Sequence, residues 1–252
     1  MWRQLQHGFR ALGELVLPQA CGACGRTLID NERDWCLACS RRLLQATGVP
    51  SCGQCGRTVG PFEFTGEHCF QCAQESWTVT GLVRAGPYGS ILGELVRKAK
   101  FGKRQELIRP LASILATRLE AADWTATLDG FVPVPTTLAS RRQYGYEPVP
   151  LMARMIAKRL DRDCVPVLGI RGKPRPQVGL PASARIENVR GVFNVRKHAD
   201  VEGATLCVID DVATTGATMR ECARVLRQAG AAAVYGAVIA RAGQQAGDDH
   251  IT

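Results

Sequence analysis

Residues 205–218 carry a pattern that few folds accommodate. The apolar segment Thr205 to Ile209 predicts a buried strand, and Asp210 and Asp211 follow it directly. A turn rich in hydroxyl side chains comes next, and apolar residues then recur at helical spacing from Ala217 onward. Backbone N–H groups at the start of such a helix are unpaired and bind anions, so the turn predicts a phosphate site in an α/β fold. Its residues are Ala213, Thr214, Thr215, Gly216, Ala217 and Thr218.

The two carboxylates predict a second part of the same ligand. Asp210 and Asp211 repel a phosphate, but they accept hydrogen bonds from the vicinal hydroxyls of a ribose. An ordinary capped turn is the weaker interpretation, because paired acids at the end of a buried strand are costly without a ligand. The pattern resembles the 5-phosphoribosyl-1-pyrophosphate (PRPP) loop of type I phosphoribosyltransferases. That resemblance implies PRPP with Mg²⁺ as the ligand.

Eight cysteines in the first 75 residues form an internal repeat. The segment CGACGRT, which begins at Cys21, recurs 31 residues later as CGQCGRT, which begins at Cys52, and each copy is followed by a further C-x-x-C pair. Each pair directs two thiolates toward one ion, and two pairs complete a tetrahedral zinc site. Because the repeat unit contains one full set, sequential pairing is favoured, while a crossed pairing stays open. The two sets are Cys21, Cys24, Cys36 and Cys39, and Cys52, Cys55, Cys69 and Cys72.

Disulfide bonds and an iron–sulfur cluster are the alternatives to two zinc ribbons. Nothing at the amino terminus resembles a secretory signal, and a reducing cytosol keeps thiols free for metal, so we expect a cytoplasmic protein with about two structural zinc ions. His68 beside Cys69 offers a nitrogen ligand, but four thiolates per site suffice. Cys164, Cys207 and Cys222 lie outside the pairs. Of these, Cys207 in the apolar strand and Cys222 on the buried face of the following helix are expected in the core.

Positive charge is concentrated in the second part of the chain. The first 75 residues hold seven Lys/Arg and seven Asp/Glu, so the net charge of +9 arises from residues 76–252. Basic residues cluster in two segments, 84–104 and 171–197. Such clusters fit a polyanion, either pyrophosphate or a nucleic-acid backbone, although a solvated basic face is the better interpretation for any single residue. The nucleic-acid candidates are Lys98, Lys100, Lys103 and Arg104.

The amino-terminal segment predicts a short amphipathic helix. Its apolar residues recur at helical spacing, but its one uninterrupted apolar run, Leu15 to Leu17, is too short for a signal peptide. No stretch of the chain approaches the length of a transmembrane segment. The residues of the apolar face are Trp2, Leu5, Phe9, Leu12 and Val16.

From Trp77 onward, predicted strands alternate with predicted helices. This alternation indicates a parallel sheet flanked by helices, whose ligands bind beyond the carboxyl ends of the strands. We therefore expect an N-terminal helix and double zinc-ribbon module over residues 1–75, a phosphoribosyltransferase-like α/β domain over 76–243 and a polar tail over 244–252. The predicted strands cover 79–88 (a strand or hairpin), 130–134, 164–167, 205–209 and 232–240, and the predicted helices 91–99, 106–122 and 149–160.

Further short motifs stand in a fixed order along nearly the whole chain. They are the four C-x-x-C pairs, Tyr88 with the Lys100-Phe101 turn, Val132-Pro-Val-Pro135, Arg141 to Glu147, Gln177-x-Gly-Leu180 with Arg185, Asn188, Gly191 and Phe193, and the PRPP loop. This series resembles the ComF family, the phosphoribosyltransferase-like proteins that include ComFC and GntX. The resemblance implies a role in DNA uptake and natural transformation, with PRPP, single-stranded DNA and proteins of the competence machinery as partners.

The resemblance also assigns the pyrophosphate and the flap. It places the pyrophosphate on the loop at the end of the 130–134 strand, and a mobile flap at residues 171–197. Where the family usually has Arg-Gly-Phe-Asn-Gln, this chain has Tyr144-Gly-Tyr-Glu-Pro148, so an expected arginine is missing and two nearby arginines are candidates to replace it. The pyrophosphate candidates are Pro133, Val134, Pro135, Arg141 and Arg142.

The catalytic group cannot be identified from the sequence. Thr214 stands where purine-salvage enzymes often carry an aspartate, and none of the four histidines lies in a motif. Two functions therefore stay open. One is a DNA-handling protein that binds PRPP, and the other is a metabolic phosphoribosyltransferase that transfers phosphoribose to an unidentified acceptor.

Overall fold

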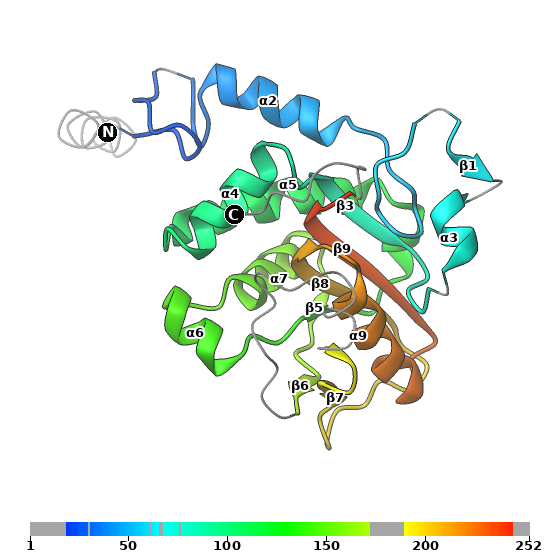
Figure 1. The fold of residues 1–252 in the computed structure, drawn as a ribbon. Helices are drawn as coiled ribbons and strands as arrows, with labels where there is room; N and C mark the ends of the chain where they lie inside the picture. The colour runs from blue at the N-terminus through cyan, green and yellow to red at the C-terminus, as the bar shows by residue number, and fades with distance from the viewer. Residues whose placement is uncertain are drawn as a thin grey trace, which may run out of the picture.

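The computed structural model describes residues 19–29, 31–60, 62–65, 68–75, 77–171 and 189–243. A cysteine-rich region, residues 19–75, flanks the edge of a five-stranded sheet that is covered by helices (Figure 1). None of the helices in these ranges is both long and apolar enough to cross a membrane. The predicted amino-terminal helix, most of the flap and the polar tail lie outside the described residues.

The sheet is parallel throughout, as the alternation of strands and helices predicted. Strands β8 and β9 are buried on both faces, which explains their nearly continuous apolar runs. Register pairs Pro133 with Ile209, so the carboxyl ends of β4 and β8 are neighbours. The strands, in spatial order, are β3 (Leu82–Pro87), β9 (Ala233–Arg241), β8 (Thr205–Ala213), β4 (Gly130–Pro133) and β5 (Asp163–Cys164).

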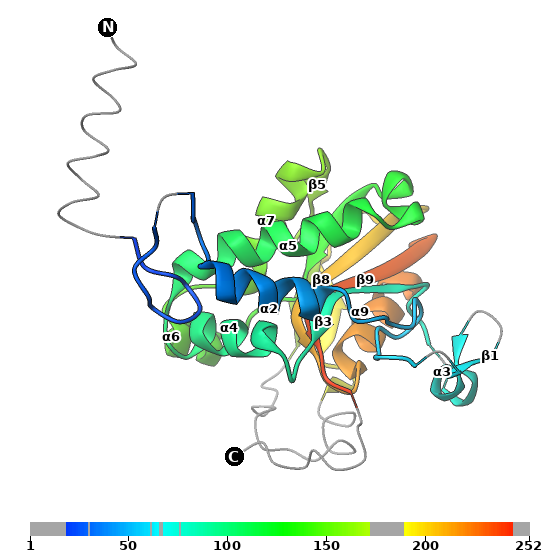
Figure 2. The same cartoon turned by 90° about the horizontal axis from the view of Figure 1, so that it is seen from above.

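Helices cover both faces of this sheet (Figure 2). Three of them, α4 (Ile91–Lys100), α5 (Ile108–Glu120) and α7 (Pro148–Arg159), lie on one face, and α9 (Ala217–Gln228) lies on the other. Phe131, Leu115 and Ile156 are fully buried between the strands and the first group of helices. The smaller elements are η1 (Gln105–Leu107), η2 (Asp123–Thr127), α6 (Leu138–Tyr144) and the antiparallel pair β6 (Leu168–Ile170) and β7 (Phe193–Val195).

Both cysteine repeats fold in the same way. In each copy a bridge closes the first C-x-x-C turn, Ala20 to Thr27 in one and Ser51 to Thr58 in the other. The glycine after the second cysteine is left-handed in both, with φ of 78° at Gly25 and 70° at Gly56. A helix then starts after the third cysteine of each copy. The elements of this region are α2 (Leu37–Thr47), β1 (Phe64–Thr65), β2 (His68–Cys69) and α3 (Phe70–Gln74).

The two repeats relate differently to the core. The buried residues of the first repeat, including Cys21, Cys39 and Leu43, belong to the same apolar cluster as the sheet and its helices. The second repeat has a cluster of its own, to which Trp77 packs. The division at residues 75 and 76 stays a prediction.

Some elements differ from their predicted bounds. β8 continues four residues beyond Ile209, because β9 pairs with it in register as far as Ala213 and Arg241. Residues 79–88 contain one parallel strand, β3, and no hairpin. The strand predicted at 164–167 is reduced to the two residues of β5, since only Gly130 and Phe131 of β4 pair with it.

Candidate functional site

The structure groups the eight paired cysteines into two tetrads. The sulfur atoms within each tetrad lie within 4.8 Å of one another, and the grouping is the sequential one. The distances from Cys24 to Cys36 and from Cys55 to Cys69 are both 3.7 Å, which excludes disulfide bonds between them. A tetrahedron with Zn–S bonds of about 2.3 Å has edges of about 3.8 Å, so the spacing fits zinc. Cys21, Cys24, Cys36 and Cys39 form the first tetrad, and Cys52, Cys55, Cys69 and Cys72 form the second.

The surroundings of the second tetrad fit a charged metal–thiolate centre. Burial, followed by repulsion from Cys52, raises the pKa of the Cys72 thiol to about 12, so four thiolates at this place need a cation. Zinc with four thiolates carries a net charge of −2, and three buried guanidinium groups lie near enough to be attracted by the Cys55 thiolate. These groups belong to Arg57, Arg84 and Arg241. Each tetrad is complete with four sulfur atoms, and the neighbouring His68 side chain is exposed on β2.

Two of the three remaining cysteines were predicted to be core residues. Cys207 of β8 and Cys222 of α9 are fully buried, which confirms that prediction for both. Burial raises the pKa of both thiols, and for Cys222 repulsion from Asp210 adds to the effect. Cys164 is half-buried at the end of β5, and burial raises the pKa of its thiol as well. A raised thiol pKa disfavours the reactive thiolate at all three positions.

The phosphate loop, which we define as residues 213–218, joins β8 to α9. Gly216 occupies the N-cap position of α9 with a left-handed φ of 77°, and the helix starts at Ala217 as predicted. The Thr215 hydroxyl accepts a hydrogen bond of 3.2 Å from the Ala217 amide, so it orders the turn and keeps its own proton free to donate. Thr214, Thr215 and Thr218 are half-buried. The loop thus combines the N-terminus of a helix three turns long with three partly accessible hydroxyl groups.

The acid pair lies inside β8, so its two side chains point to opposite faces of the sheet. Asp210 is on the side of α9, where its charge raises the pKa of the Cys222 thiol. It is the more exposed of the two acids. Burial, followed by repulsion from Asp211, raises the pKa of Asp210 to about 7. Asp211 is only 7% exposed and borders the packed space between β9 and the helices α4, α5 and α7.

Lys100 provides the counter-charge for the acid pair. Its ammonium lies 2.7 Å from Oδ2 of Asp211, at the carboxyl end of α4. The lysine is half-buried, yet its attraction to Asp211 and then to Asp210 outweighs the effect of burial and raises the pKa of Lys100. Its ammonium is also 6.0 Å from the centre of the Tyr144 ring. The carboxyl end of α4 therefore lies beside the acid pair.

The candidate pyrophosphate loop is a neighbour of the acid pair. The Val134 amide donates a hydrogen bond of 2.9 Å to the carbonyl of Ile209, the residue before Asp210. Pro133 and Val134 are buried, and Pro135 is half-buried. The structure thus brings together the two loops that lie 75 residues apart in sequence and were both predicted to bind parts of PRPP.

The two candidate arginines follow this loop on α6. Arg141 and Arg142 are exposed, and the only ion pair that the described residues offer Arg141 is a loose one of 3.8 Å to Glu147. Tyr144, on the same short helix, contacts Phe101 edge to face at 5.7 Å. α6 therefore stands beside the Lys100 turn at the rim of the site, with its arginines free to reach an anion.

The four nucleic-acid candidates have different surroundings. Lys98 donates to the Ala23 carbonyl in the first cysteine repeat, and Arg104 donates to the Gly22 carbonyl at 3.2 Å and to Glu106 at 2.7 Å. Lys100 is the partner of Asp211, and Lys103 is exposed. Three of the four thus hold the molecule's own parts together.

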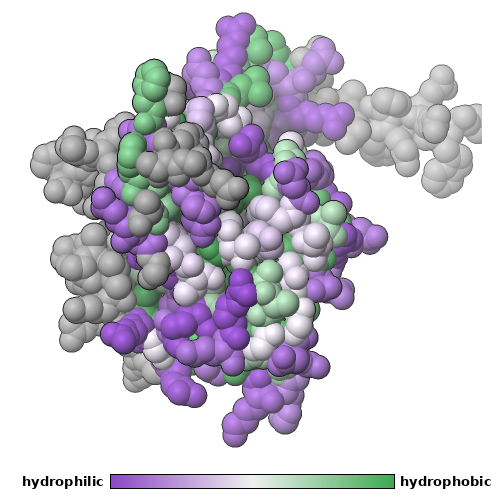
Figure 3. All heavy atoms as spheres, turned by 90° about the vertical axis from the view of Figure 1, so that its right-hand side faces the viewer, coloured by the Kyte–Doolittle hydropathy of each residue, from purple (hydrophilic) through white to green (hydrophobic). Residues whose placement is uncertain are grey.

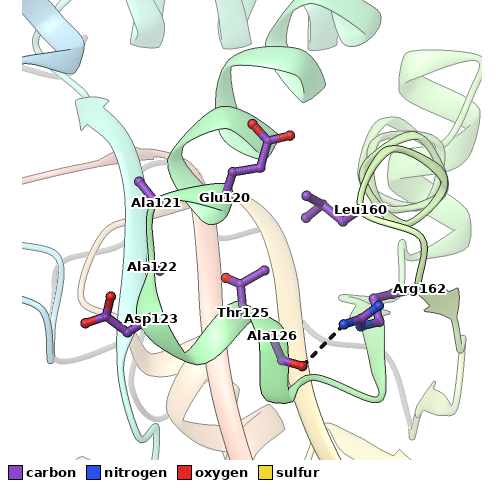
Figure 4. Close-up of a pocket in the computed structure, with 8 residues that line it drawn as sticks. All are labelled: Glu120, Ala121, Ala122, Asp123, Thr125, Ala126, Leu160 and Arg162. Carbon is purple, nitrogen blue, oxygen red and sulfur yellow. Dashed lines mark hydrogen bonds between the residues drawn. The ribbon is translucent and has the colours of Figure 1, made fainter.

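One depression in the described part of the surface is unrelated to this site. It measures about 380 Å³ and lies where α5 and η2 lead into β4, which is the amino-terminal edge of the strands (Figure 4). Arg162 in its wall donates a hydrogen bond of 3.2 Å to the Ala126 carbonyl, and Glu120 is paired with Arg159. Two of its three charged side chains are therefore engaged, and the two predicted ligand loops are at the opposite edge of the sheet.

Comparisons with known proteins agree with both parts of this architecture. Residues 12–73 match the double zinc ribbon domain and residues 109–252 match the phosphoribosyl transferase domain. DNA utilization protein YhgH of Salmonella typhi is 30% identical over 227 residues, which cover 87% of this chain and 96% of that protein. Competence protein F of Haemophilus influenzae is 26% identical over 215 residues, which cover 83% and 91%. The chain belongs to the ComF family.

This ComF protein also overlays on solved phosphoribosyltransferases. A structure of an adenine phosphoribosyltransferase gives a TM-score of 0.38 at 17% identity, covering 57% of this chain and 74% of that chain. Orotate phosphoribosyltransferase from Aeropyrum pernix gives a TM-score of 0.36 at 21% identity, covering 59% and 67%.

Some residues around the site could not be found from the sequence. Arg241 ends an apolar strand, and its buried position depends on carbonyl groups contributed by other elements. Trp77 was recognised only as the point where the predicted pattern changes, yet its ring contacts α9 through Arg220 at 4.9 Å. The Lys100-Phe101 turn was noted as a motif, but only the fold shows that its lysine meets Asp211.

Proposed function

We propose that this ComF protein binds PRPP with Mg²⁺ at the edge formed by β8 and β4. The adjacency of the phosphate loop, the acid pair and the Pro133–Pro135 loop supports this ligand, because each can receive a different part of PRPP. The helix N-terminus receives the 5′-phosphate, and the acids accept the ribose hydroxyls. The amides and arginines after β4 receive the pyrophosphate.

The proposed site accommodates a divalent metal on its acidic side. Magnesium prefers carboxylate oxygens together with substrate phosphates, and Asp210 is the accessible carboxylate beside the phosphate loop. Bound Mg²⁺ would neutralise charge on the leaving pyrophosphate. Lys100 forms an ion pair of 2.7 Å with Asp211, and this pair holds the Asp211 side chain in place behind the ribose site.

We further propose that PRPP binding serves a DNA-handling role. The names of the two relatives, DNA utilization protein YhgH and competence protein F, support this role. The positive charge of residues 76–252 gives the domain an attraction for a phosphate backbone. Single-stranded DNA is the proposed polymer, and proteins of the competence machinery are the proposed partners.

Transfer of phosphoribose to an acceptor is the second candidate function. The complete acid pair and Thr-Thr-Gly turn favour it, since both are expensive to keep in a buried strand end that binds nothing. Among the described residues the cation paired with Asp211 is Lys100, and the pair raises the pKa of this lysine, so Lys100 supplies positive charge rather than a base. Release of pyrophosphate from PRPP in the presence of candidate acceptors would separate turnover from binding.

Thermal denaturation with and without PRPP and Mg²⁺ tests the proposed ligand. At a PRPP concentration a hundredfold above its Kd, stability should rise by about 2.7 kcal/mol, which corresponds to roughly 5–10 °C in Tm for a chain of this size. Ribose 5-phosphate should raise Tm less, because it lacks the pyrophosphate. Asp210→Asn combined with Asp211→Asn should remove the effect of PRPP. If zinc-loaded wild-type protein shows no shift with PRPP, the proposal is wrong.

A further inference from the structure

The second cysteine repeat lies against the back of the phosphate loop. We call residues 50–75, which contain the second tetrad, the second ribbon. The part of the molecule that carries this ribbon and the face beside it has a mixed, mainly polar surface (Figure 3). Below that surface, two arginines and one tryptophan connect the ribbon to the loop. Their contacts are specific enough to assign the ribbon a role in ligand binding.

Arg241 forms the first connection. Its side chain is 0% exposed, and its Nε donates a hydrogen bond of 2.9 Å to the carbonyl of Cys55, a residue of the second tetrad. Its Nη1 donates to the carbonyl of Ala213, the first residue of the phosphate loop, at 3.1 Å. Burial, followed by repulsion from Arg57, lowers the pKa of Arg241 to about 10, so it is still charged at neutral pH. One charged side chain therefore joins the first C-x-x-C turn of the second ribbon, which we call its zinc knuckle, to the phosphate loop.

Arg220 forms the second connection, from the first turn of α9. Its guanidinium pairs with Glu75 of the second ribbon at 3.0 Å and donates to the carbonyl of Thr215 in the loop. The latter contact, at 3.4 Å, is the weaker of the two arginine contacts to the loop. Glu75 also pairs with Arg57 of the ribbon at 2.8 Å. Glu75 is thereby held in position from the ribbon side.

Close packing reinforces these hydrogen bonds. A Cβ atom at Gly216 would lie 2.7 Å from the ring of Trp77, which packs on the buried cysteines of the second ribbon. A Cβ atom at Gly56, the residue after Cys55, would lie 2.4 Å from Leu82 of β3. Glycine at both positions allows the knuckle, the sheet edge and the loop to approach without a gap.

These contacts, together with the hydrogen bond of 2.9 Å that the Ala242 amide donates to the Ala213 carbonyl, fix where the loop amides point. In a trans peptide the C=O of one residue and the N–H of the next point in opposite directions. Because the carbonyl groups of Ala213 and Thr215 are held toward the two arginines, the N–H groups of Thr214 and Gly216 point away from them. Those N–H groups are among the donors that a phosphate at this helix N-terminus needs.

We propose that Arg241 and Arg220 are positioning residues through which the second ribbon presets the phosphate loop for the 5′-phosphate of a phosphoribosyl ligand. This rests on the proposed PRPP site. A loop whose donors are already oriented loses less conformational entropy on binding, so the intact ribbon raises affinity without touching the ligand. Zinc in the second tetrad thus controls the phosphate site.

The first repeat serves as the internal comparison. Its contacts with the α/β domain include those of Lys98 and Arg104 with the carbonyls of Ala23 and Gly22, and both side chains come from the α4 region. Those contacts fix the first repeat to the opposite face of the sheet from α9. Loss of zinc from the first tetrad should therefore affect stability more than phosphate affinity.

Titration calorimetry with three ligands and three variants tests the proposal. Arg220→Gln and Arg241→Lys should each weaken binding of ribose 5-phosphate and of PRPP by about tenfold, the equivalent of one hydrogen bond. Pyrophosphate with Mg²⁺ should bind each variant as it binds wild type, because its loop follows β4. Arg224→Gln is the matched control, since Arg224 lies one turn further along α9 and pairs with Glu221 rather than the loop. Zinc content should be unchanged in Arg220→Gln and Arg224→Gln.

Two results would overturn the proposal. One is wild-type affinity for ribose 5-phosphate in Arg220→Gln, which decides the matter even if Arg241→Lys fails to fold. The other is an equal loss for pyrophosphate, which would show general damage. If wild type binds no phosphoribosyl ligand, the proposed function fails separately. Hydrogen exchange at the Thr214 and Gly216 amides then tests the positioning itself, because exchange should be faster in Arg220→Gln and unchanged in Arg224→Gln.

Discussion

At the scale of single residues, the site is organised by two adjacent acids of β8 whose side chains point to opposite faces of the sheet. Asp210 and Asp211 are adjacent in sequence, but the strand separates their side chains and gives them different partners. Asp211 forms an ion pair with Lys100. Burial and repulsion from Asp211 raise the pKa of Asp210, and attraction to Lys100 offsets only part of that rise. The two acids therefore differ in their surroundings, because an ion pair holds Asp211 and Asp210 is the more exposed of the two.

This difference predicts how PRPP binding depends on pH. The pKa of Asp210 is raised to about 7, so the acid gains a proton as pH falls below neutrality and loses capacity as an acceptor. Affinity for PRPP with Mg²⁺ should fall by up to about tenfold per pH unit below pH 7. Calorimetry from pH 5.5 to 8.5 measures it. Asp210→Asn is the baseline, because any pH dependence that it retains comes from the phosphates of the ligand.

The same pKa has a consequence for stability, with the sign set by linkage. The folded protein holds the proton of Asp210 more tightly than the unfolded chain, whose Asp has an ordinary pKa near 3.8. The contribution of Asp210 to stability is therefore greatest at acid pH, declines as pH rises through this interval and is fully lost above about 7. Asp210→Asn should remove this decline from a denaturant titration series. An unchanged profile would show that Asp210 titrates as an exposed acid.

The sequence could predict the acids and the phosphate loop but not their counter-charge. A strand, two acids and a Thr/Gly turn are local, so their chemistry is visible in fourteen consecutive residues. Lys100 and Arg241 reach the site only because α4 and β9 are folded against β8. Long-range pairings of this kind leave no periodic signal, and a lysine in a basic cluster is easily interpreted as a surface residue.

At the scale of elements, the zinc knuckles of the two cysteine repeats were the easiest to predict from the sequence. The points at which the paired strands end were the hardest. Each knuckle is fixed by a short pattern of cysteine and glycine, and both copies fold alike. The predicted end of β8 was wrong by four residues, because pairing with β9 sets the length of this strand. α6 was not predicted, since its seven residues are too few to show a helical period.

The two cysteine tetrads predict two zinc ions that can be removed independently of each other. Purified protein should contain about two zinc ions per chain. Cys24→Ser and Cys55→Ser should each remove about one ion and lower the stability of the ribbon concerned. Metal analysis and thermal denaturation measure both effects. Only Cys55→Ser should also weaken PRPP, since the second tetrad is the one joined to the phosphate loop. Absence of zinc, or eight titratable thiols in native protein, would contradict the zinc assignment.

At the scale of the whole molecule, the positive charge is divided between internal and external tasks. Lys98, Lys100 and Arg104 hold the first repeat or the acid pair, so replacing them would disturb the fold as well as any contact with DNA. Arg97 and Lys103 belong to the same basic segment and are exposed. They are the better test of a nucleic-acid surface, because their loss leaves both the zinc knuckle and the phosphate site in place.

The last prediction concerns this surface. Single-stranded DNA should bind with an affinity that falls steeply with salt, because each neutralised phosphate releases counterions. Arg97→Ala with Lys103→Ala should weaken binding and flatten the slope of log K against log salt by about 1.4, the share of two contacts. The matched control is Arg154→Ala with Lys158→Ala, which removes two exposed charges from α7, outside the basic segment. Asp210→Asn should leave DNA binding nearly intact. Equal effects of the two double variants would show a general charge effect, and salt-independent binding would exclude the phosphate backbone as the contact.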